Sequence, residues 1–252
     1  MKRVLTTAIL CAAIVGLAAC TTDGSGSTDA SGRKNVEVGM INSGPPFEYM
    51  DKGQLTGFEV ELLSDVAKKE NWNVSYKYMN FDAMIPALQS HTVDAAAGGF
   101  FITPERKKAI SFSNSYYSDG NELVVSKGSE IKSPEMLKGK KIVAKKGASS
   151  AAAAQKVADQ YGASVILLPD EPSMFLALSN GTADALVDDS AVIAYKEKTD
   201  GTELVAIKQL DETPVGLAFQ KNSKLVEGFN QALTQLKSDG TLAKLKTKYQ
   251  MN

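Results

Sequence analysis

The sequence predicts an α/β protein made of two similar lobes. After residue 33, short apolar runs alternate with stretches whose apolar residues recur at helical spacing, which is typical of parallel sheets covered by helices. Six residues also recur at a constant offset of 90 positions. They are Met84, Ala87, Leu88, Thr92, Asp94 and Ala95, and then Met174, Ala177, Leu178, Thr182, Asp184 and Ala185. At about 150 residues per domain, the 252 residues allow one large or two small domains.

Three elements open the first lobe. Residues 35–41 form an apolar run typical of a strand, and residues 73–79 alternate apolar and polar side chains as a strand does. The helix between them is predicted over residues 57–70, because four apolar residues share one helical stripe: Phe58, Leu62, Leu63 and Val66.

A second helix begins at Phe81, since the spacing i, i+3, i+4, i+7 is kept by Phe81, Met84, Ile85 and Leu88. Residues 93–98 are short and apolar, as in a buried parallel strand. The next helix begins at Thr103-Pro104-Glu105, with threonine as N-cap, proline at the first helical position and an acid in the first turn.

The second half repeats the alternation. Strands are predicted at residues 122–126, 141–144, 164–168, 183–187, 203–207 and 215–220. Helices are predicted at residues 149–161, 173–180, 190–197 and from 225 to the C-terminus. The repeat places Gly98-Gly99 and Asp188-Asp189 at equivalent strand ends. Ligands bind outside the carboxyl ends of such strands, so two facing ends predict a binding cleft.

Composition excludes several classes of function. With 28 Lys+Arg against 29 Asp+Glu, the formal net charge is −1, so the chain lacks the basic excess that nucleic-acid binding requires. One histidine, His91, and two cysteines exclude metal sites with several His ligands and zinc sites built from Cys and His. We therefore expect no metal and no other cofactor.

The first 19 residues are typical of an export signal. Lys2 and Arg3 precede an apolar stretch, residues 4–17, that is too short and wrongly flanked for a spanning helix. Leu17-Ala18-Ala19-Cys20 resembles the bacterial lipobox, which implies cleavage before Cys20 and lipidation of its thiol; a plain secretory signal is the alternative. Residues 20–33 are predicted to form a flexible tether. We expect an extracytoplasmic protein anchored to the membrane by lipid.

Four stretches resemble a known family: PPFEYMDKGQLTGFEVELLSDVA, FDAMIPALQSHTVDAAAGGFFITPERKKAISFSNSYYSDG, ADALVDDSAVIAY and VGLAFQKNSKLVEGFNQALTQLKSDGTLAKL. They are similar to the polar amino-acid-binding proteins of ABC importers, solute-binding protein family 3, over about residues 34–249. The resemblance implies a two-lobed, type II periplasmic-binding-protein-like fold, with parallel-type sheets flanked by helices and joined by two hinge strands. It assigns residues 34–123 and 213–252 to lobe 1 and residues 124–212 to lobe 2.

The resemblance also implies the ligand and the partner: a monomer that captures an amino acid and delivers it to an ABC permease. A zwitterion in a dry cleft requires one cation and one anion. The resemblance assigns Arg106 to the carboxylate, aided by N–H groups at the helix start near Thr103, and Asp189 to the ammonium group, aided by the Gly99 carbonyl. The alternative for Arg106 is a solvated arginine on the helix surface. The alternative for Asp189 is an acid that stabilises the start of the helix at residue 190.

Aromatic walls and charged side chains complete the implied site. Phe81 and Phe47 match positions beside the ligand side chain, although each also fits an ordinary core position. Lys145 and Asp188 match positions that reach the distal end of the ligand. One cation and one anion there favour glutamine; a dominant Asp188 favours a basic amino acid, a dominant Lys145 an acidic one, and both residues also fit a solvated position.

Three residues depart from the family pattern. Gly44 stands where many relatives carry an aromatic lid, Phe101 where many carry Ser or Thr to bind the carboxylate, and Ala148 where many carry Thr. Ser149 follows Ala148 and can supply a hydroxyl, and the N–H groups that begin this helix favour an anion.

Two other functions remain open. An exported enzyme on the same fold, similar to cyclohexadienyl dehydratases, would need an acid or base in the cleft, for which Glu105 and Glu122 are candidates. His91 is expected at a surface turn instead. A ligand-sensing lipoprotein is the third possibility. We expect a binding protein rather than an enzyme.

Overall fold

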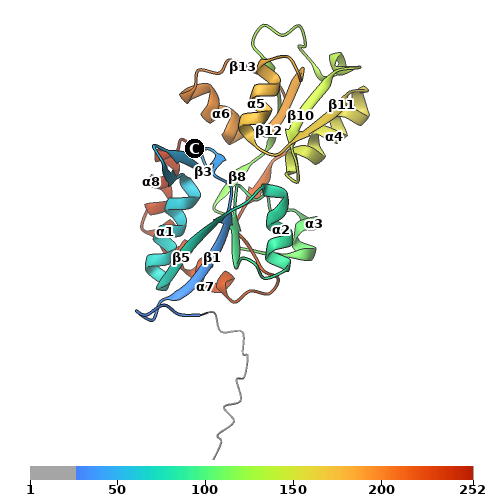
Figure 1. Ribbon diagram of the computed structural model, residues 1–252. Helices are drawn as coiled ribbons and strands as arrows, with labels where there is room; N and C mark the ends of the chain where they lie inside the picture. Colours follow the sequence, from blue (N-terminus) through green and yellow to red (C-terminus); the bar gives the residue numbers. More distant parts are fainter. Residues whose placement is uncertain (1–26, 252) are drawn as a thin grey trace, which may run out of the picture.

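Two five-stranded sheets form the framework of the computed structural model, which describes residues 27–251 (Figure 1). The strands of the first sheet are β1 (Lys34–Met40), β5 (Trp72–Tyr78), β6 (Ala95–Ala97), β7 (Ser111–Phe112) and β15 (Ala218–Phe219), in the order β5-β1-β6-β15-β7. The strands of the second are β9 (Asn121–Ser126), β10 (Lys141–Lys145), β11 (Ser164–Leu168), β12 (Ala185–Asp189) and β13 (Leu204–Gln209), in the order β11-β10-β12-β9-β13. We call each sheet with its helices lobe 1 and lobe 2.

Both sheets are mixed rather than wholly parallel. β1 is parallel to β5 and β6, and β10 is parallel to β11 and β12. In contrast, β15 is antiparallel to β6 and β7, and β9 is antiparallel to β12 and β13. The antiparallel strands are those next to the segments that pass between the lobes, so their direction follows from that connection and not from a helical crossover.

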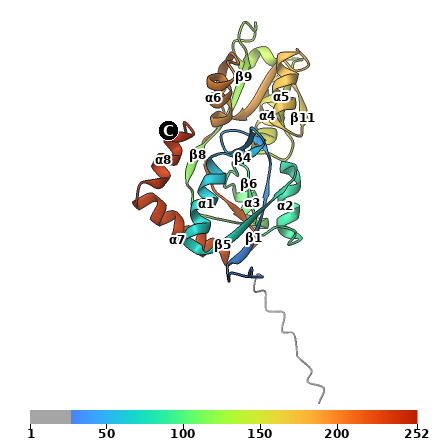
Figure 2. The same ribbon diagram turned by 60° about the vertical axis from the view of Figure 1, so that its left-hand side comes forward.

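Helices cover both faces of each sheet. Between residues 27 and 251 they are α1 (Phe58–Glu70), α2 (Phe81–Gln89), α3 (Pro104–Ala109), α4 (Ser149–Tyr161), α5 (Glu171–Ser179), α6 (Ser190–Thr199), α7 (Leu225–Ser238) and α8 (Thr241–Lys248), with a 3₁₀ turn at Pro134–Leu137. In lobe 1, α1, α7 and α8 pack on one face and α2 on the other (Figure 1 and Figure 2). In lobe 2, α4 packs on one face and α5 and α6 on the other.

Two predicted elements are divided in the structure. The helix predicted from residue 225 is α7 and α8, because Gly240 between them adopts φ 78°, a left-handed conformation that glycine takes without strain. This break lets α8 fold back against α1. The strand predicted at residues 215–220 is β14 (Thr213–Val215) and β15, which lie in different sheets. The small sheet of β2 (Ser43–Gly44), β3 (Glu48–Asp51) and β4 (Gln54–Thr56) was not predicted, because such short strands carry little periodic pattern.

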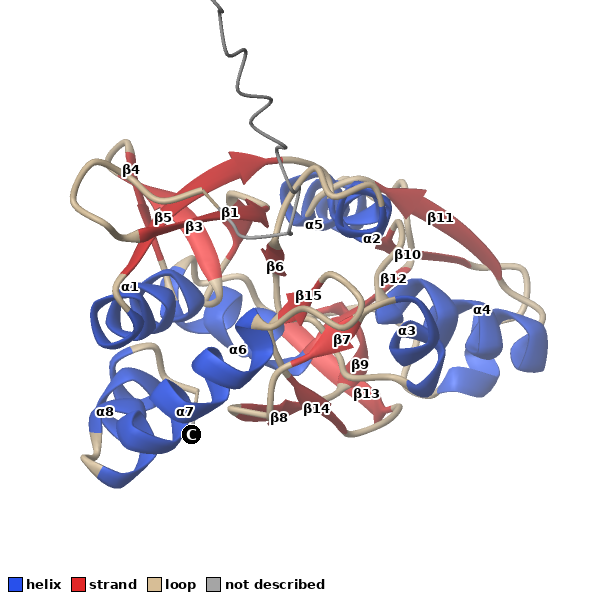
Figure 3. Ribbon diagram, turned by 90° about the horizontal axis from the view of Figure 1, so that it is seen from below, coloured by secondary structure: helices blue, strands red, loops and turns tan. Residues whose placement is uncertain are grey.

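A pair of short strands connects the lobes. β8 (Tyr117–Asp119) and β14 are antiparallel, with Thr213 opposite Asp119, and they lie side by side in Figure 3. β8 belongs to the passage from β7 to β9, and β14 to the return from β13 to β15. β9 is paired within the second sheet from Asn121 onward, so the sheets divide at this strand pair.

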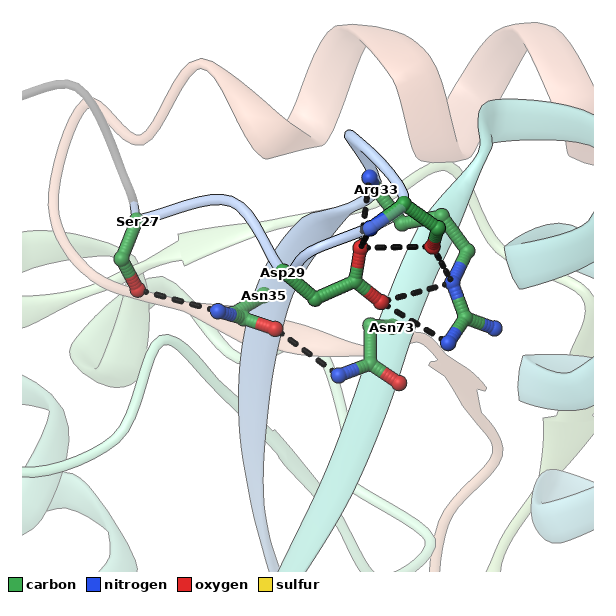
Figure 4. A network of polar contacts seen from close by, with 6 residues as sticks. Ser27, Asp29, Arg33, Asn35 and Asn73 are labelled. Carbon is green, nitrogen blue, oxygen red and sulfur yellow. Dashed lines mark hydrogen bonds and ion pairs between the residues drawn. The ribbon is translucent and has the colours of Figure 1, made fainter.

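The segment before β1 is held against lobe 1 (Figure 4). Asp29 Oδ1 accepts a hydrogen bond from the Arg33 N–H at 2.9 Å, and Asp29 Oδ2 lies 2.8 Å from Arg33 Nη2. Asn35 Nδ2 donates to Ser27 Oγ at 3.1 Å, and Asn73 Nδ2 donates to Asn35 Oδ1 at 2.8 Å. The flexible tether predicted for residues 20–33 therefore does not include residues 27–33.

The predicted signal, residues 1–19, and the lipidation site at Cys20 lie outside the described residues. Within residues 27–251, no helix is long and apolar enough to cross a membrane.

The 90-residue repeat is one structural unit that occurs in both lobes. In lobe 1, the Asp94 N–H donates to the Glu37 carbonyl at 2.8 Å, and Asp94 Oδ2 accepts from the Glu37 N–H at 2.9 Å. In lobe 2, Asp184 makes the same two bonds to Lys141, at 2.8 and 2.9 Å. Each aspartate thus ties the start of its strand to the neighbouring strand. The prediction of two similar α/β lobes is confirmed.

Asp94→Ala and Asp184→Ala are each expected to lower the free energy of unfolding by about 1–2 kcal/mol, because a strand N–H loses its charged acceptor. Urea unfolding followed by circular dichroism measures the change. Asp51→Ala removes an exposed carboxylate beside the β3–β4 turn and serves as the control. Equal stability of the Asp94 variant and this control would show that the tie is dispensable.

Candidate ligand-binding site

A cleft lies between the lobes, beyond the ends of β6 and β12. Gly98 and Gly99 follow β6, and Asp188 and Asp189 end β12, with all four residues buried. A cavity of about 640 Å³ opens between the lobes beside α3 and α4, and none of these four residues is among its lining. Its lining includes Phe101, Thr103 and Arg106 from lobe 1 and Asn121, Ala148 and Ser149 from lobe 2. Arg106 of lobe 1 and Asp189 of lobe 2 interact electrostatically, so the end of β12 faces lobe 1.

The two lobes are in direct contact around this cleft. Lys146 Nζ of lobe 2 lies 2.9 Å from Asp82 Oδ2 of lobe 1. On the other side, the rings of Tyr49 and Tyr195 lie 5.6 Å apart. α6 contributes Val192 to the apolar core of lobe 1 as well as packing on its own sheet. The lobes therefore touch on more than one side of the cleft.

The start of α3 positions Arg106. Thr103 is the N-cap, and its hydroxyl accepts the Arg106 N–H at 3.2 Å, as its sequence predicts. The guanidinium then donates through Nη1 to the Phe101 carbonyl at 3.1 Å and through Nη2 to the Gly147 carbonyl of lobe 2 at 3.3 Å. A solvated helix arginine would make none of these tertiary contacts.

Aromatic rings and a carboxylate surround the same guanidinium. The Arg106 carbon Cζ lies 5.4 Å from the Phe81 ring centroid and 5.2 Å from that of Phe100. Burial lowers the pKa of Arg106 to about 10, while Asp189 acts in the opposite direction. Arg106 stays charged at neutral pH, in a site where a ligand carboxylate would meet little competition from water.

Asp189 is a buried carboxylate at the end of β12, only 6% exposed. Burial raises its pKa to about 8; Lys145 opposes the shift, and Asp119 and Glu171 add to it. Asp189 does not cap α6 with its side chain. The side chain of Asp119 caps α6 instead: its Oδ1 and Oδ2 accept the Ala191 N–H at 3.3 and 3.4 Å. Asp189 is nonetheless the N-cap residue of α6, where a negative charge interacts favourably with the helix dipole, so its position fits both predicted roles.

Lys145 and Asp188 are buried rather than solvated, at 3% and 0% exposure. Lys145 forms an ion pair with Glu171, the first residue of α5, and its Nζ lies 5.1 Å from the Phe81 ring centroid. Burial lowers the pKa of Lys145, but Glu171, Asp188 and Asp189 raise it by more, so the amine keeps its proton. Glu171 was not predicted as a site residue, because an acid in the first turn of a helix is commonplace.

A second unpredicted residue, Glu59, fixes the end of β6. Its carboxylate accepts the Gly98 N–H at 2.6 Å and the Gly99 N–H at 3.2 Å, and it also accepts the Tyr116 hydroxyl. A Cβ at Gly99 would lie 3.1 Å from the Phe47 ring, so Phe47 packs directly on this turn. Phe47 also lies in the lobe 1 core, which fits the alternative of a packing role.

The start of α4 in lobe 2 presents backbone N–H groups that no side chain caps. Ala148 is the N-cap of α4, and no side chain caps that helix. Ser149 Oγ donates to Asn121 Oδ1 at 3.4 Å. Phe101 is 1% exposed and forms a β-bridge with Val215 of the crossing strand, so it contributes a carbonyl and a ring.

The candidate acids and the histidine of the enzyme alternative have other surroundings. His91 is exposed in a turn with φ 57°, as predicted. Glu105 is exposed at the rim of the cavity and pairs with Lys108 at 2.8 Å. Glu122 lies on β9, where burial raises its pKa.

Two α/β lobes with charged groups of both signs buried between them define a two-lobed binding protein. The sequence pattern of the bacterial extracellular solute-binding proteins, family 3, matches residues 36–252. The chain belongs to this family, and the resemblance inferred from its four stretches is confirmed.

Known proteins with different ligands are similar over nearly the whole chain. The arginine-binding extracellular protein ArtP of Bacillus subtilis (strain 168) is 31% identical, over 99% of this chain and 98% of its own. The ABC transporter glutamine-binding protein GlnH of the same strain is 30% identical, over 95% and 94%. A solved structure of an ancestral arginine-binding protein bound to arginine is 39% identical, with a TM-score of 0.79 over 85% of this chain and 97% of that chain.

The melting temperature is expected to rise by several degrees as the pH falls from 8 to about 5. Burial raises the pKa of Asp119 to about 7 and that of Asp189 to about 8, so the folded state binds more protons than the unfolded state between about pH 4 and 8. Protonation in this range therefore favours folding. Calorimetry across this pH range measures the slope, and Asp189→Asn should flatten it. A melting temperature that falls on acidification to pH 5 would contradict the expectation.

Proposed function

We propose that the protein is a lipid-anchored, extracytoplasmic solute-binding protein that captures a polar amino acid between its lobes and delivers it to an ABC permease. One observation carries this proposal: half-buried Arg106 of lobe 1 and buried Asp189 of lobe 2 interact electrostatically across the interface between the lobes. Membership in the solute-binding family and the names of ArtP and GlnH support it.

The two groups match the two ends of an amino acid, because an ammonium group beside Asp189 would oppose its raised pKa and favour the ionised carboxylate. A carboxylate can accept two parallel hydrogen bonds from Arg106, and the N–H groups at the start of α4 face the same cavity. An ammonium group can donate to Asp189 and to the Gly99 carbonyl, which would remove the cost of an unpaired buried carboxylate. Phe81 and Phe47 then enclose the ligand and exclude water.

Binding of an amino acid would close the lobes, because each lobe supplies one of the two groups that hold the ligand. Because one charge comes from each lobe, a bound zwitterion holds the lobes together and shifts the population toward the closed arrangement. The β8–β14 pair is the natural hinge, since both connections run through it. We propose that lobe 2 begins at Asn121, three residues earlier than the predicted boundary after residue 123, because β9 begins there and belongs to the lobe 2 sheet. The permease would recognise the closed form. We propose binding without chemical conversion.

Arg106→Ala is expected to weaken amino-acid binding about 100-fold, since removing one partner of a buried charge pair commonly changes affinity by about 2 to 5 kcal/mol. Purified protein is unfolded and refolded to remove carried-over ligand, then screened against amino acids by melting temperature and titration calorimetry. Lys107→Ala, on the exposed side of the same helix, is the matched control. Unchanged affinity in the Arg106 variant would refute the assignment.

Cys20→Ser is expected to move the protein from the membrane fraction to the soluble fraction, because the acyl chains attached at Cys20 supply the anchor. Fractionation and incorporation of labelled palmitate measure the change. A wild-type protein that is soluble and unlabelled would support the plain secretory signal instead.

A further inference from the structure

A second cavity, which we call the hinge cavity, lies on lobe 1 beside strand β8. Its volume is about 440 Å³, and its lining includes Tyr117 and Ser118 from β8, Lys237 from α7 and Lys246 from α8. It shares no lining residue with the cavity at the start of α4. Among residues 27–251, its lining holds two lysines and no acid. The carboxylate of Glu212 accepts the Ser118 hydroxyl at 3.1 Å from outside this lining.

The two lysines of the hinge cavity lack an acidic partner. Burial and the charge of Lys237 both lower the pKa of Lys246. Lys248, on the same helix as Lys246, pairs with Glu61, whereas neither Lys237 nor Lys246 forms an ion pair within the described part of the chain. Lys237 Nζ donates to the Ser115 carbonyl at 2.9 Å, which uses one of the three donors of its ammonium group. An anion between the two ammonium groups would offset their mutual repulsion.

Tyr117 links the hinge cavity to the proposed amino-acid site. It pairs with Val215 of β14 in the strand pair that connects the lobes. Lys246 Nζ lies 5.6 Å from the centroid of the Tyr117 ring, and the Phe47 ring lies 6.3 Å from the same ring, edge-on. Phe47 in turn packs against the turn at Gly99. Contacts therefore run from α8 through the hinge to the turn that follows β6.

We infer that the hinge cavity binds a small oxyanion, carrying phosphate, sulfate or carboxylate groups, between Lys237 and Lys246. Two ammonium groups can each donate charge-assisted hydrogen bonds to one such anion, and the volume of the cavity is typical of a small-molecule site. Because β8 is part of the hinge, the cavity has this shape when the lobes touch, so a bound anion favours that arrangement. By linkage, the anion and an amino acid then strengthen each other's binding. The anion site does not depend on the proposed function, whereas this coupling rests on it.

Phosphate, sulfate and citrate are titrated into the ligand-stripped protein by calorimetry, with sodium chloride adjusted so that the ionic strength stays constant. We expect saturable binding of at least one of them, with a dissociation constant of about 1 mM or below. Lys246→Gln removes one charge and should weaken this binding at least tenfold, whereas Lys246→Arg keeps the charge and should retain it. Lys244→Gln, at an exposed position of the same helix, is the matched control and should leave the binding unchanged. Lys237→Gln replaces the first variant if Lys246→Gln does not fold.

The coupling is tested by the dissociation constants of L-arginine and L-glutamine, measured with and without a saturating concentration of the bound anion. We expect the wild type to bind an amino acid at least threefold more tightly with the anion, and Lys246→Gln to show no such gain. Absence of saturable anion binding, or equal anion affinity in the wild type and the folded variant, would overturn the site. Amino-acid affinity that does not change when the anion binds would overturn the coupling. Absence of all amino-acid binding would overturn the proposed function together with the coupling, and the anion titration would still decide the site.

Discussion

Burial of charge between two lobes is the constraint on which the rest of this structure depends. Arg106, Asp189 and Lys145 lie between the lobes, where charged groups require partners: Lys145 pairs with Glu171 of its own lobe, and Arg106 reaches the Gly147 carbonyl of the opposite lobe. The surrounding fold serves to hold them: Thr103 caps the helix of Arg106, and Asp119 caps α6 so that Asp189 remains available. An amino acid is a ligand that satisfies both signs at once.

The repeat explains why the site has this symmetry. Asp94 and Asp184 make the same pair of bonds to the neighbouring strand, so the strands that begin after them start in the same register in each lobe. β6 and β12 therefore end at equivalent places, and each end supplies groups to the cleft. The lobes differ in the residues at these strand ends: a glycine turn fixed by Glu59 in lobe 1, and two acids in lobe 2. One scaffold thus places different polar groups at the equivalent strand ends of the two lobes.

Local patterns in the sequence determined much of this protein. The stripe of α1, the cap at Thr103 and the repeat were all readable, because helix spacing and capping depend on neighbours within a few residues. The resemblance located Arg106 and Asp189 as candidates. Tertiary structure alone decided that α8 folds back after Gly240 and that Lys145 is paired with Glu171. These contacts join residues far apart in the chain. Burial sets their geometry and their charge, and no local sequence pattern encodes burial.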